Sequence, residues 1–387
     1  MNVRQDIRLP DFGRLLKRAT STGRAKRSQE RVVNRDLVGL KVGASHIAAA
    51  QVVNNGSPEL VRIARRPIGE GIVVGGEVKN SAALGAALAD FFSQNDLPKS
   101  SVRLGVANNR IGVRAFEIRG VSDEAQLANA IRFRAQELLP IPLEEAVLDY
   151  HVLSHIVDDM GEEMWRILLV VAHRDLIDRY VEACDTAGIG LVGIDLEAFG
   201  LLRGLAAPNH ASGEGETSAL VGVSLGHDRS TFAVSDGRVC EFARVLNWGG
   251  ERLTEAIAEA VPLPALEADA AKRSLSLEDP TIRPRGLDGE QVERALTAVR
   301  SELRSFAREL VSSLHFYQSQ PDSLPIGEIV LTGGTSQLPG LAEEIGRVVG
   351  VGVRVADPLA RVQAPPDFAA SPDHGSIAVA IGLGIED

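Results

Sequence analysis

Two short segments of this chain repeat each other, and the repeat limits the folds that the chain can adopt. Leu37–Gly43 reads LVGLKVG, and Leu220–Gly226, which begins 183 positions later, reads LVGVSLG. Each has the apolar run of a buried strand and a glycine turn. A second predicted strand follows in each copy and ends in a turn signal, Asn54-Asn55-Gly56 in the first and Ser235-Asp236-Gly237 in the second. We therefore predict two related halves, each built on a sheet.

Strand and helix patterns alternate between and after the two copies, which is typical of an α/β fold. Between the copies, Val170–Ala172 and Leu191–Ile194 predict strands, while Asp175–Ala187 and Leu196–Leu205 predict helices. After the second copy, Gly289–Ser319 predicts one long amphipathic helix. The 387 residues correspond to about two to four domains, and an aromatic content of only 4% suits an α/β protein rich in small residues.

Charge divides the chain into a basic arm and an acidic body. Residues 1–36 hold ten basic and four acidic residues, a net charge of +6; since the whole chain carries −11, the other 351 residues carry −17. The sequence has no signal-peptide core and no apolar run near the roughly 20 residues that span a bilayer. Cys184 and Cys240 fit neither a disulfide framework nor a metal-ligand spacing. These features predict a cytoplasmic body whose membrane contact is peripheral.

Several glycines lie at predicted turns and helix starts, the positions at which a protein backbone can bind a phosphate group. The hairpin glycines Gly43 and Gly226, the pair Gly249-Gly250 and the pair Gly333-Gly334 all adjoin predicted strands or helices. Glycine permits a positive φ and a close backbone approach, and amides at a turn or helix N-terminus attract anionic oxygens. An isolated Gly-Gly pair is more often only a turn, but together these glycines predict one nucleotide site between the two halves.

The order of these motifs resembles that of the actin-like ATPase superfamily, which includes actin, the cell-division protein FtsA and sugar kinases. Leu37–Ile47 is similar to its first phosphate loop, and Val221–Thr231 is similar to its second. Thr332–Thr335 resembles the turn that borders adenosine. Asn247–Gly250 resembles the glycine pair that precedes the second small subdomain.

The resemblance implies an ATP site and a candidate catalytic residue. Glu197 is similar to the acid that positions the attacking water. Asp269 and Lys272 are similar to an acid and a lysine near the ribose, although aspartate is unusual at the first of these positions. The residues implied to bind nucleotide are Lys41, Gly43, Ala44, Ser45, Ser224, Gly226, Gly249, Gly250, Asp269, Lys272, Gly333, Gly334 and Thr335.

One further segment resembles the PilM family of type IV pilus assembly. Phe133–Glu145 reads FRAQELLPIPLEE and runs on to Leu148-Asp149-Tyr150. The resemblance covers about residues 37–387 and implies an actin-like α/β fold of duplicated RNase H-like halves with an FtsA-type inserted subdomain. The implied parts are the arm (1–36), the first half (37–105 and 166–215), the insertion (106–165), the second half (216–260 and 328–387) and a smaller subdomain (261–327).

Two residues depart from the superfamily pattern, where aspartates organise Mg²⁺. Lys41 stands in the first phosphate loop and Ser224 in the second. Mg²⁺ prefers carboxylate, phosphate and water oxygens, and phosphoryl transfer depends on positioning and electrostatics. We therefore expect a degenerate site with hydrolysis very weak or absent. The cleft is either unused or able to bind ATP with Mg²⁺ binding in doubt, and a competent ATPase is the remaining alternative. No histidine cluster has a ligand pattern, so we predict no metal site.

The resemblance implies a scaffold at the inner membrane. Such a protein would dock the short cytoplasmic tail of a PilN-type membrane protein through the insertion and the first subdomain, with the tail extended in a groove or along a strand edge. The alternatives are an active actin-like Mg-ATPase and the related cytoplasmic scaffold of a type II secretion system. Self-association is left open.

The basic arm suggests a separate interaction. Each Lys or Arg near an anionic lipid surface contributes about 1 kcal/mol to binding, and apolar residues on one helical face would add to it. The arm is interpreted either as a disordered solubilising tail or as this membrane contact. Nucleic-acid binding is not expected because the arm lacks interleaved aromatic residues and the body is acidic. The arm residues singled out are Arg8, Phe12, Arg14, Leu15, Leu16, Lys17 and Arg18.

Overall fold

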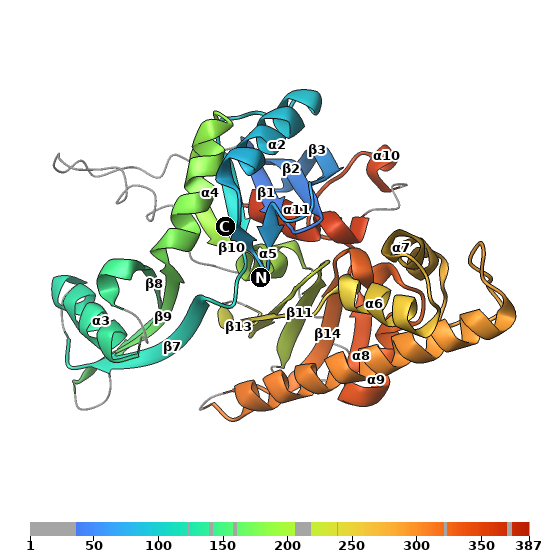
Figure 1. Cartoon of the computed structure of the whole chain (residues 1–387). Coiled ribbons are helices and arrows are strands. Elements are labelled where there is room, and N and C mark those ends of the chain that lie inside the picture. Colours follow the sequence, from blue (N-terminus) through green and yellow to red (C-terminus); the bar gives the residue numbers. More distant parts are fainter. Residues whose placement is uncertain are drawn as a thin grey trace.

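The computed structural model shows an α/β protein with two five-stranded sheets and a separate three-stranded sheet (Figure 1). The structure describes residues 36–121, 124–138, 142–157, 161–205, 218–237, 239–320, 323–369 and 374–386. The basic arm before Asp36 and the expected boundary loop at 206–217 lie outside the described residues, as does the apolar-Pro turn at 139–141. None of the described helices is both long and apolar enough to cross a membrane.

The first half is built on the sheet that contains the first copy of the repeat. Its strand order is β10-β6-β1-β2-β3; β1, β2 and β3 are antiparallel neighbours, and β6 and β10 continue the sheet in parallel from β1. The strands are β1 (Asp36–Val42), β2 (His46–Asn54), β3 (Pro58–Pro67), β6 (Val102–Val106) and β10 (Leu191–Leu196), and the flanking helices are α2 (Ser81–Gln94) and α4 (Arg174–Thr186).

The second half repeats this topology. Its strand order is β13-β12-β11-β14-β15, again three antiparallel strands followed by two parallel ones. The strands are β11 (Ala219–Leu225), β12 (Ser230–Ser235), β13 (Cys240–Leu246), β14 (Ile326–Thr332) and β15 (Gly352–Val355). The matching order of strands confirms the predicted duplication of two sheet-based halves.

Two short helices join the sheets. In Figure 1, α5 (Glu197–Gly204) and α11 (Ala378–Gly384) lie between the two halves; α11 packs on β1 and β2, α5 packs on β11 and β12, and the helices contact each other. Buried ionic and polar contacts fix them, because Arg203 pairs with Asp195 and donates to the carbonyl of Gly382. The two phosphate-loop candidates are thereby held opposite each other.

Four helices pack against the sheet of the second half and share one hydrophobic core with it. They are α6 (Gly250–Ala260), α7 (Ala265–Ser274), α8 (Gly289–Gln318) and α9 (Leu341–Val349). The long helix α8 confirms the amphipathic prediction for Gly289–Ser319. It begins at a capping box in which Asp288 and Gln291 bond to each other's backbone amides, which satisfies donors that a helix start leaves free. The short helical elements are η1 (Leu143–Glu145), η2 (Gly334–Gln337), α10 (Pro366–Ala369) and η3 (His374–Ile377), and two short strands, β4 (Val73–Val74) and β5 (Glu77–Val78), pair with each other.

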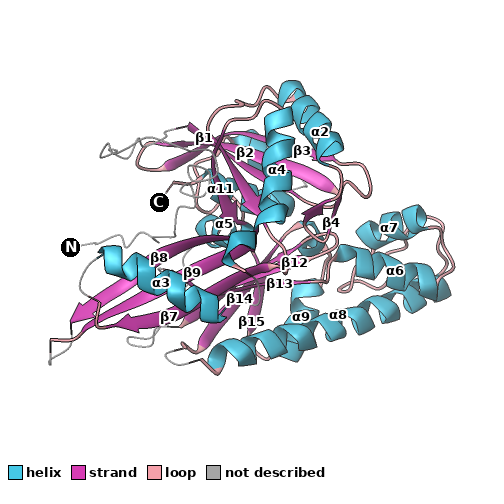
Figure 2. Ribbon diagram, turned by 60° about the vertical axis from the view of Figure 1, so that its left-hand side comes forward, coloured by secondary structure: helices cyan, strands magenta, loops and turns pink. Residues whose placement is uncertain are grey.

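The inserted subdomain is a sheet of order β7-β9-β8 with one helix on its face (Figure 2). Its elements are β7 (Ile111–Arg119), α3 (Glu124–Leu138), β8 (Ala146–Val157) and β9 (Glu163–His173). Leu127 and Ile131 of α3 are buried against Ile167 and Leu169 of β9 in its small core. The FtsA-type insertion is thus confirmed as part of the fold.

The expected end of the insertion at residue 165 falls inside β9. The segment Val170–Ala172, predicted as a strand of the first half, instead pairs with β7 and β8 in the inserted sheet. The strand continues to His173 because β7 pairs with it as far as Ala172 and β8 as far as His173. Helix α4 follows directly, so the chain returns to the first half at residue 174.

Candidate functional site

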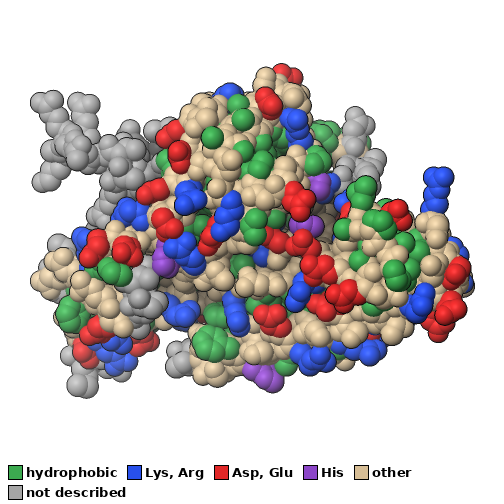
Figure 3. Space-filling view, in the orientation of Figure 1, with side chains coloured by type: hydrophobic (Ala, Val, Ile, Leu, Met, Phe, Trp, Pro, Cys, Tyr) green, Lys and Arg blue, Asp and Glu red, His purple; other side chains and the backbone are tan. Residues whose placement is uncertain are grey.

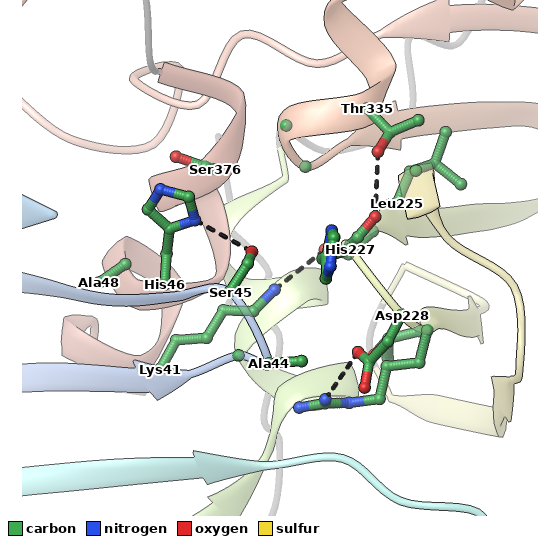
Figure 4. A pocket seen from close by; sticks show the side chains of 18 of the residues that line it. Lys41, Ala44, Ser45, His46, Ala48, Leu225, His227, Asp228, Thr335 and Ser376 are labelled. Atoms are coloured by element: carbon green, nitrogen blue, oxygen red, sulfur yellow. Dashed lines mark hydrogen bonds and ion pairs between the residues drawn. The ribbon is translucent and has the colours of Figure 1, made fainter. Parts of the chain in front are cut away.

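The candidate site is a cleft of about 180 Å³ between the two halves, at the ends of β1 and β11. Figure 4 shows Lys41 reaching into it from one side, with His227 and Asp228 on the other. Twelve of the thirteen predicted nucleotide residues line this cleft, and Glu197 lines it too. The exception is Gly249, which packs instead against the carbonyl of His227, where a Cβ would collide.

The two repeated hairpins place equivalent residues at the cleft. In the first half the amide of Gly43 donates to the carbonyl of His46 at 2.9 Å, and in the second the amide of Gly226 donates to the carbonyl of Arg229 at 3.0 Å. The strands that enter these turns bring Lys41 and Ser224, at matching positions of the repeat, to face each other. The Nζ atom of Lys41 lies 3.4 Å from the Oγ atom of Ser224.

Glu197 sits at the floor of the cleft and is paired with cations on both carboxylate oxygens. Its side chain is 2% exposed at the first turn of α5. Lys41 Nζ lies 3.2 Å from Oε2, and Arg229 Nη2 lies 3.5 Å from Oε1. A buried carboxylate is stable only when it is paired, and here the two halves of the protein each supply one partner.

Arg229 crosses from the second half into the first. Its guanidinium contacts the carbonyl of Val42 at 3.2 Å and the carboxylate of Asp228 at 3.1 Å, while its Nε is buried and finds no hydrogen-bond partner among the described residues. Burial alone would lower the pKa of Arg229, but the negative charges led by Glu197 outweigh it and raise the pKa above its usual value. The residue is therefore a permanent buried cation between the halves.

These residues do not fit a magnesium ion. Both oxygens of Glu197 already face ammonium or guanidinium groups, and the positions expected to carry aspartates hold a lysine and a serine. Among the described residues, no three His, Cys, Asp or Glu side chains gather where they could hold a metal. A hard divalent cation prefers anionic oxygen ligands, and it would have to displace Lys41 and Arg229 to reach the oxygens of Glu197.

The opposite wall of the cleft is a hydrogen-bonded cluster on α6 and α7. Lys272 Nζ donates to the carbonyl of Gly250 at 3.0 Å, to Thr254 Oγ1 at 2.7 Å and to Asp269 Oδ1 at 2.7 Å. Arg273 lies 2.9 Å from the other oxygen of Asp269. Burial opposes the ionisation of Asp269, but the hydrogen bond and charge of Lys272, with Arg273, prevail and hold its pKa below its usual value.

The glycine turn after β14 closes this wall. Gly333 has a φ of +93°, a conformation that favours glycine, and its amide donates to the carbonyl of Gly375 at 2.8 Å. Thr335 Oγ1 donates to the carbonyl of Gly226 at 3.0 Å, which ties the turn to the second phosphate-loop candidate. A Cβ built on Gly334 would meet no atom within 4 Å, so open space adjoins this turn.

Sequence reasoning did not single out several residues that shape the cleft. Arg229 and Asp228 are the most important, and His227 and Arg273 also line it. A signal was present, because His227-Asp228-Arg229 is a charged run in a tight turn between two strands that are buried along their whole length. Beyond the cleft, the face shown in Figure 3 carries acidic and basic side chains interspersed.

The comparisons with known proteins agree with this architecture. A family model described as type IV pilus assembly protein PilM matches residues 39–387. Cell division protein FtsA of Escherichia coli strain K12 is 25% identical, over 90% of this chain and 89% of that protein. A solved structure titled as a PilM-PilN type IV pilus biogenesis complex has 25% identity and a TM-score of 0.75, covering 91% of this chain and 99% of that one. The ethanolamine utilization protein EutJ of Carboxydothermus hydrogenoformans, at 14% identity and a TM-score of 0.52 over 92% and 91% of the two chains, shares the fold.

Proposed function

Because this chain belongs to the PilM family of type IV pilus assembly proteins, we propose that it is a cytoplasmic scaffold at the inner membrane that docks the cytoplasmic tail of a PilN-type protein. The observation that carries the proposal is the likeness, over 91% of the chain, to a structure whose title names a PilM-PilN complex. The TM-score of that comparison is 0.75, and it covers 99% of the other chain.

The inserted sheet offers a suitable docking edge. Among the described residues, β8 pairs only with β9, so its other edge has backbone groups that an extended peptide could pair with. Strand addition of this kind gives affinity through main-chain hydrogen bonds and specificity through alternate side chains.

Ion pairs connect the insertion to the rest of the protein, which supports its use as a docking platform. On one side, Arg166 of β9 lies 3.1 Å from Glu241 of β13 in the second half, and Tyr317 donates to the same carboxylate at 2.9 Å. On the other, Arg110 before β7 contacts Asp175 of α4 at 2.9 Å. These contacts join the insertion to both halves of the protein.

A peptide titration tests the docking. The full chain should bind a synthetic N-terminal tail of the PilN-type protein from the same organism saturably in calorimetry, and a scrambled tail of the same composition should not bind. Equal heats from the two peptides, or no saturation with the native tail, would reject the scaffold proposal.

We further propose that the cleft takes ATP without a metal and does not turn it over. The fixed cations Lys41 and Arg229 support this, because they supply the positive charge that Mg²⁺ would bring but not its coordination geometry. ATP affinity should then be the same with Mg²⁺ and with EDTA, and phosphate release should stay at background and not fall in Glu197→Ala. Replacing Lys41 and Ser224 together by aspartate should make ATP binding depend on Mg²⁺; metal-dependent binding or turnover by the native protein would overturn the proposal.

A further inference from the structure

A small hairpin lies between the cleft and the inserted subdomain. It consists of β4 (Val73–Val74) and β5 (Glu77–Val78), joined by Gly75 and Gly76. The two glycines have φ values of +59° and +77°, as a two-residue turn with both central residues in the left-handed region requires. The hairpin thus ends in a tight turn at Gly75 and Gly76, which forms its tip.

On the cleft side, this tip is bonded to the second phosphate-loop candidate. The amide of Gly75 donates to Asp228 Oδ2 at 2.7 Å. The other oxygen of Asp228 pairs with Arg229, which contacts Glu197 in the first half. The hairpin is therefore connected, through Asp228, to the carboxylate and guanidinium groups that line the cleft.

On the other side, the tip is bonded to the segment that enters the insertion. The side-chain amide of Asn108, whose exposure is only 2%, donates to the carbonyl of Gly75 at 2.6 Å. The Oδ1 atom of the same Asn108 accepts from the backbone amide of Arg110 at 2.7 Å, and its carbonyl accepts from the amide of Ile111 at 3.1 Å. Ile111 is the first residue of β7, so Asn108 positions the start of the inserted sheet.

Arg110 then connects the entry of the insertion to its exit. Its Nη2 atom lies 2.9 Å from the Nδ1 atom of His173, the last residue of β9, and 2.9 Å from Asp175 in the first turn of α4. Its Nη1 atom lies 3.6 Å from Glu77 of the hairpin. Both covalent connections of the inserted sheet therefore meet at one side chain that also contacts the hairpin.

The hairpin cannot move independently of these neighbours. Tyr180 donates to the carbonyl of Gly76 at 3.1 Å, and Arg179 donates to the carbonyl of Val78 at 3.1 Å, so α4 holds the hairpin from behind. A Cβ on Gly76 would collide with the carbonyl of Ala107, which shows how closely the tip packs on the entry segment. A displacement of the cleft loop must then either break these contacts or carry the entry segment with it.

We propose that this hairpin couples the cleft loop at residues 226–229 to the base of the inserted subdomain, through Asp228, Gly75, Asn108 and Arg110. An anion in the cleft would compete with Asp228 and Glu197 for their cations and so alter the bond from Asp228 to Gly75. Because coupling between sites is reciprocal, a peptide on the insertion would change anion affinity by the same factor. This last step rests on the proposed docking function; the mechanical coupling does not.

Hydrogen exchange of the full chain tests the coupling without any ligand. Asp228→Ala removes the acceptor of Gly75 but touches no residue of the insertion. The amides of Arg110, Ile111 and the end of β9 should nevertheless exchange about fivefold faster, the effect of losing roughly one hydrogen bond. The matched control is Asp269→Ala, which removes another ion-paired carboxylate from the same cleft; among the described residues its ion-pair partners are Lys272 and Arg273 rather than groups of the hairpin. Unchanged exchange at the insertion base in Asp228→Ala, or equal acceleration in the control, would overturn the proposal.

A second variant breaks the connection in the middle. Asn108→Asp keeps an oxygen for the amide of Arg110 but loses the donor to Gly75, and it should produce the same acceleration at the end of β9. The tail peptide is then titrated onto the native protein and both variants. Accelerated exchange without any peptide binding would reject the docking function and leave the coupling intact, whereas peptide binding with unchanged exchange would reject the coupling alone.

Discussion

Arg229 is the residue whose removal most directly tests how the two halves are held together. The substitution Arg229→Met keeps much of the side-chain volume and removes the charge. Glu197 would lose one of its two cationic partners, the carbonyl of Val42 would lose its donor, and Asp228 would keep only its bond from Gly75. The change therefore leaves a 2% exposed carboxylate on Lys41 alone.

The structure sets the expected magnitude. Removing one partner of a buried ion pair typically costs about 3–5 kcal/mol of unfolding free energy. Because Lys41 still lies 3.2 Å from Glu197, the lower end applies, and we expect a loss of about 3 kcal/mol. Adding Glu197→Gln removes the stranded charge, so the double variant should be more stable than the sum of the single changes by about 1–2 kcal/mol.

Urea unfolding followed by tryptophan fluorescence measures these values. Trp248 is 3% exposed and stacks on Phe306 in the second half, so its emission reports the loss of that core. Arg273→Met is the control, since Arg273 also pairs with a carboxylate at 2.9 Å but its side chain is 63% exposed; it should cost less than about 1 kcal/mol. Equal stabilities of the two methionine variants, or strictly additive effects in the double variant, would refute the reasoning.

Other parts of the molecule give three further predictions. Since the pKa of folded Asp269 lies below its ordinary value of 3.8, its ionised form stabilises the fold above that pH; the stability advantage over Asp269→Asn should shrink as pH falls below about 4, and an advantage constant from pH 7 to 2 would contradict this. Gly76→Ala should lower the unfolding free energy by about 1–2 kcal/mol from its positive φ and by more from its collision, whereas Gly71→Ala, at a φ of +74° in open space, reports the backbone cost alone. Deleting residues 1–35 should weaken co-sedimentation with anionic lipid vesicles at low salt and leave neutral vesicles unaffected; equal binding with and without the arm would exclude it as a membrane contact.

Much of the fold could be predicted from the sequence because its hairpins and helices form between residues that are close together in the chain. A hairpin forms between neighbouring strands, so the repeated apolar-Gly segments at Leu37–Gly43 and Leu220–Gly226 were enough to predict two alike sheets. The long helix α8 could be predicted for the same reason, since its apolar stripe and its Asp288 cap lie within one segment. The repeat also places Lys41 and Ser224 at matching positions of its two copies, so their correspondence is evident from the sequence.

The end of the insertion could not be predicted in the same way. Strand β9 is partly exposed from Glu163 to Arg166 and mostly buried from Ile167 onward. In the sequence, this change from polar to apolar residues resembles the start of a new strand of a core sheet. Its partners lie 45 to 61 residues away in β7 and less than 30 away in β8, and sequence alone does not indicate which sheet it joins. Only the pairing in three dimensions assigns the whole strand to the insertion.

The sequence by itself determined the two halves, the glycine turns between them and the replacement of two expected acids by Lys41 and Ser224. The tertiary structure alone decided that Arg229 lies buried against Glu197 and that Asp228 meets Gly75, 153 positions away. Contacts of this kind depend on how the two halves are oriented across α5 and α11. That orientation is set by packing between residues that are far apart in the sequence. A charged turn between buried strands indicates that a cation is held there, but only the folded chain shows which carboxylate holds it.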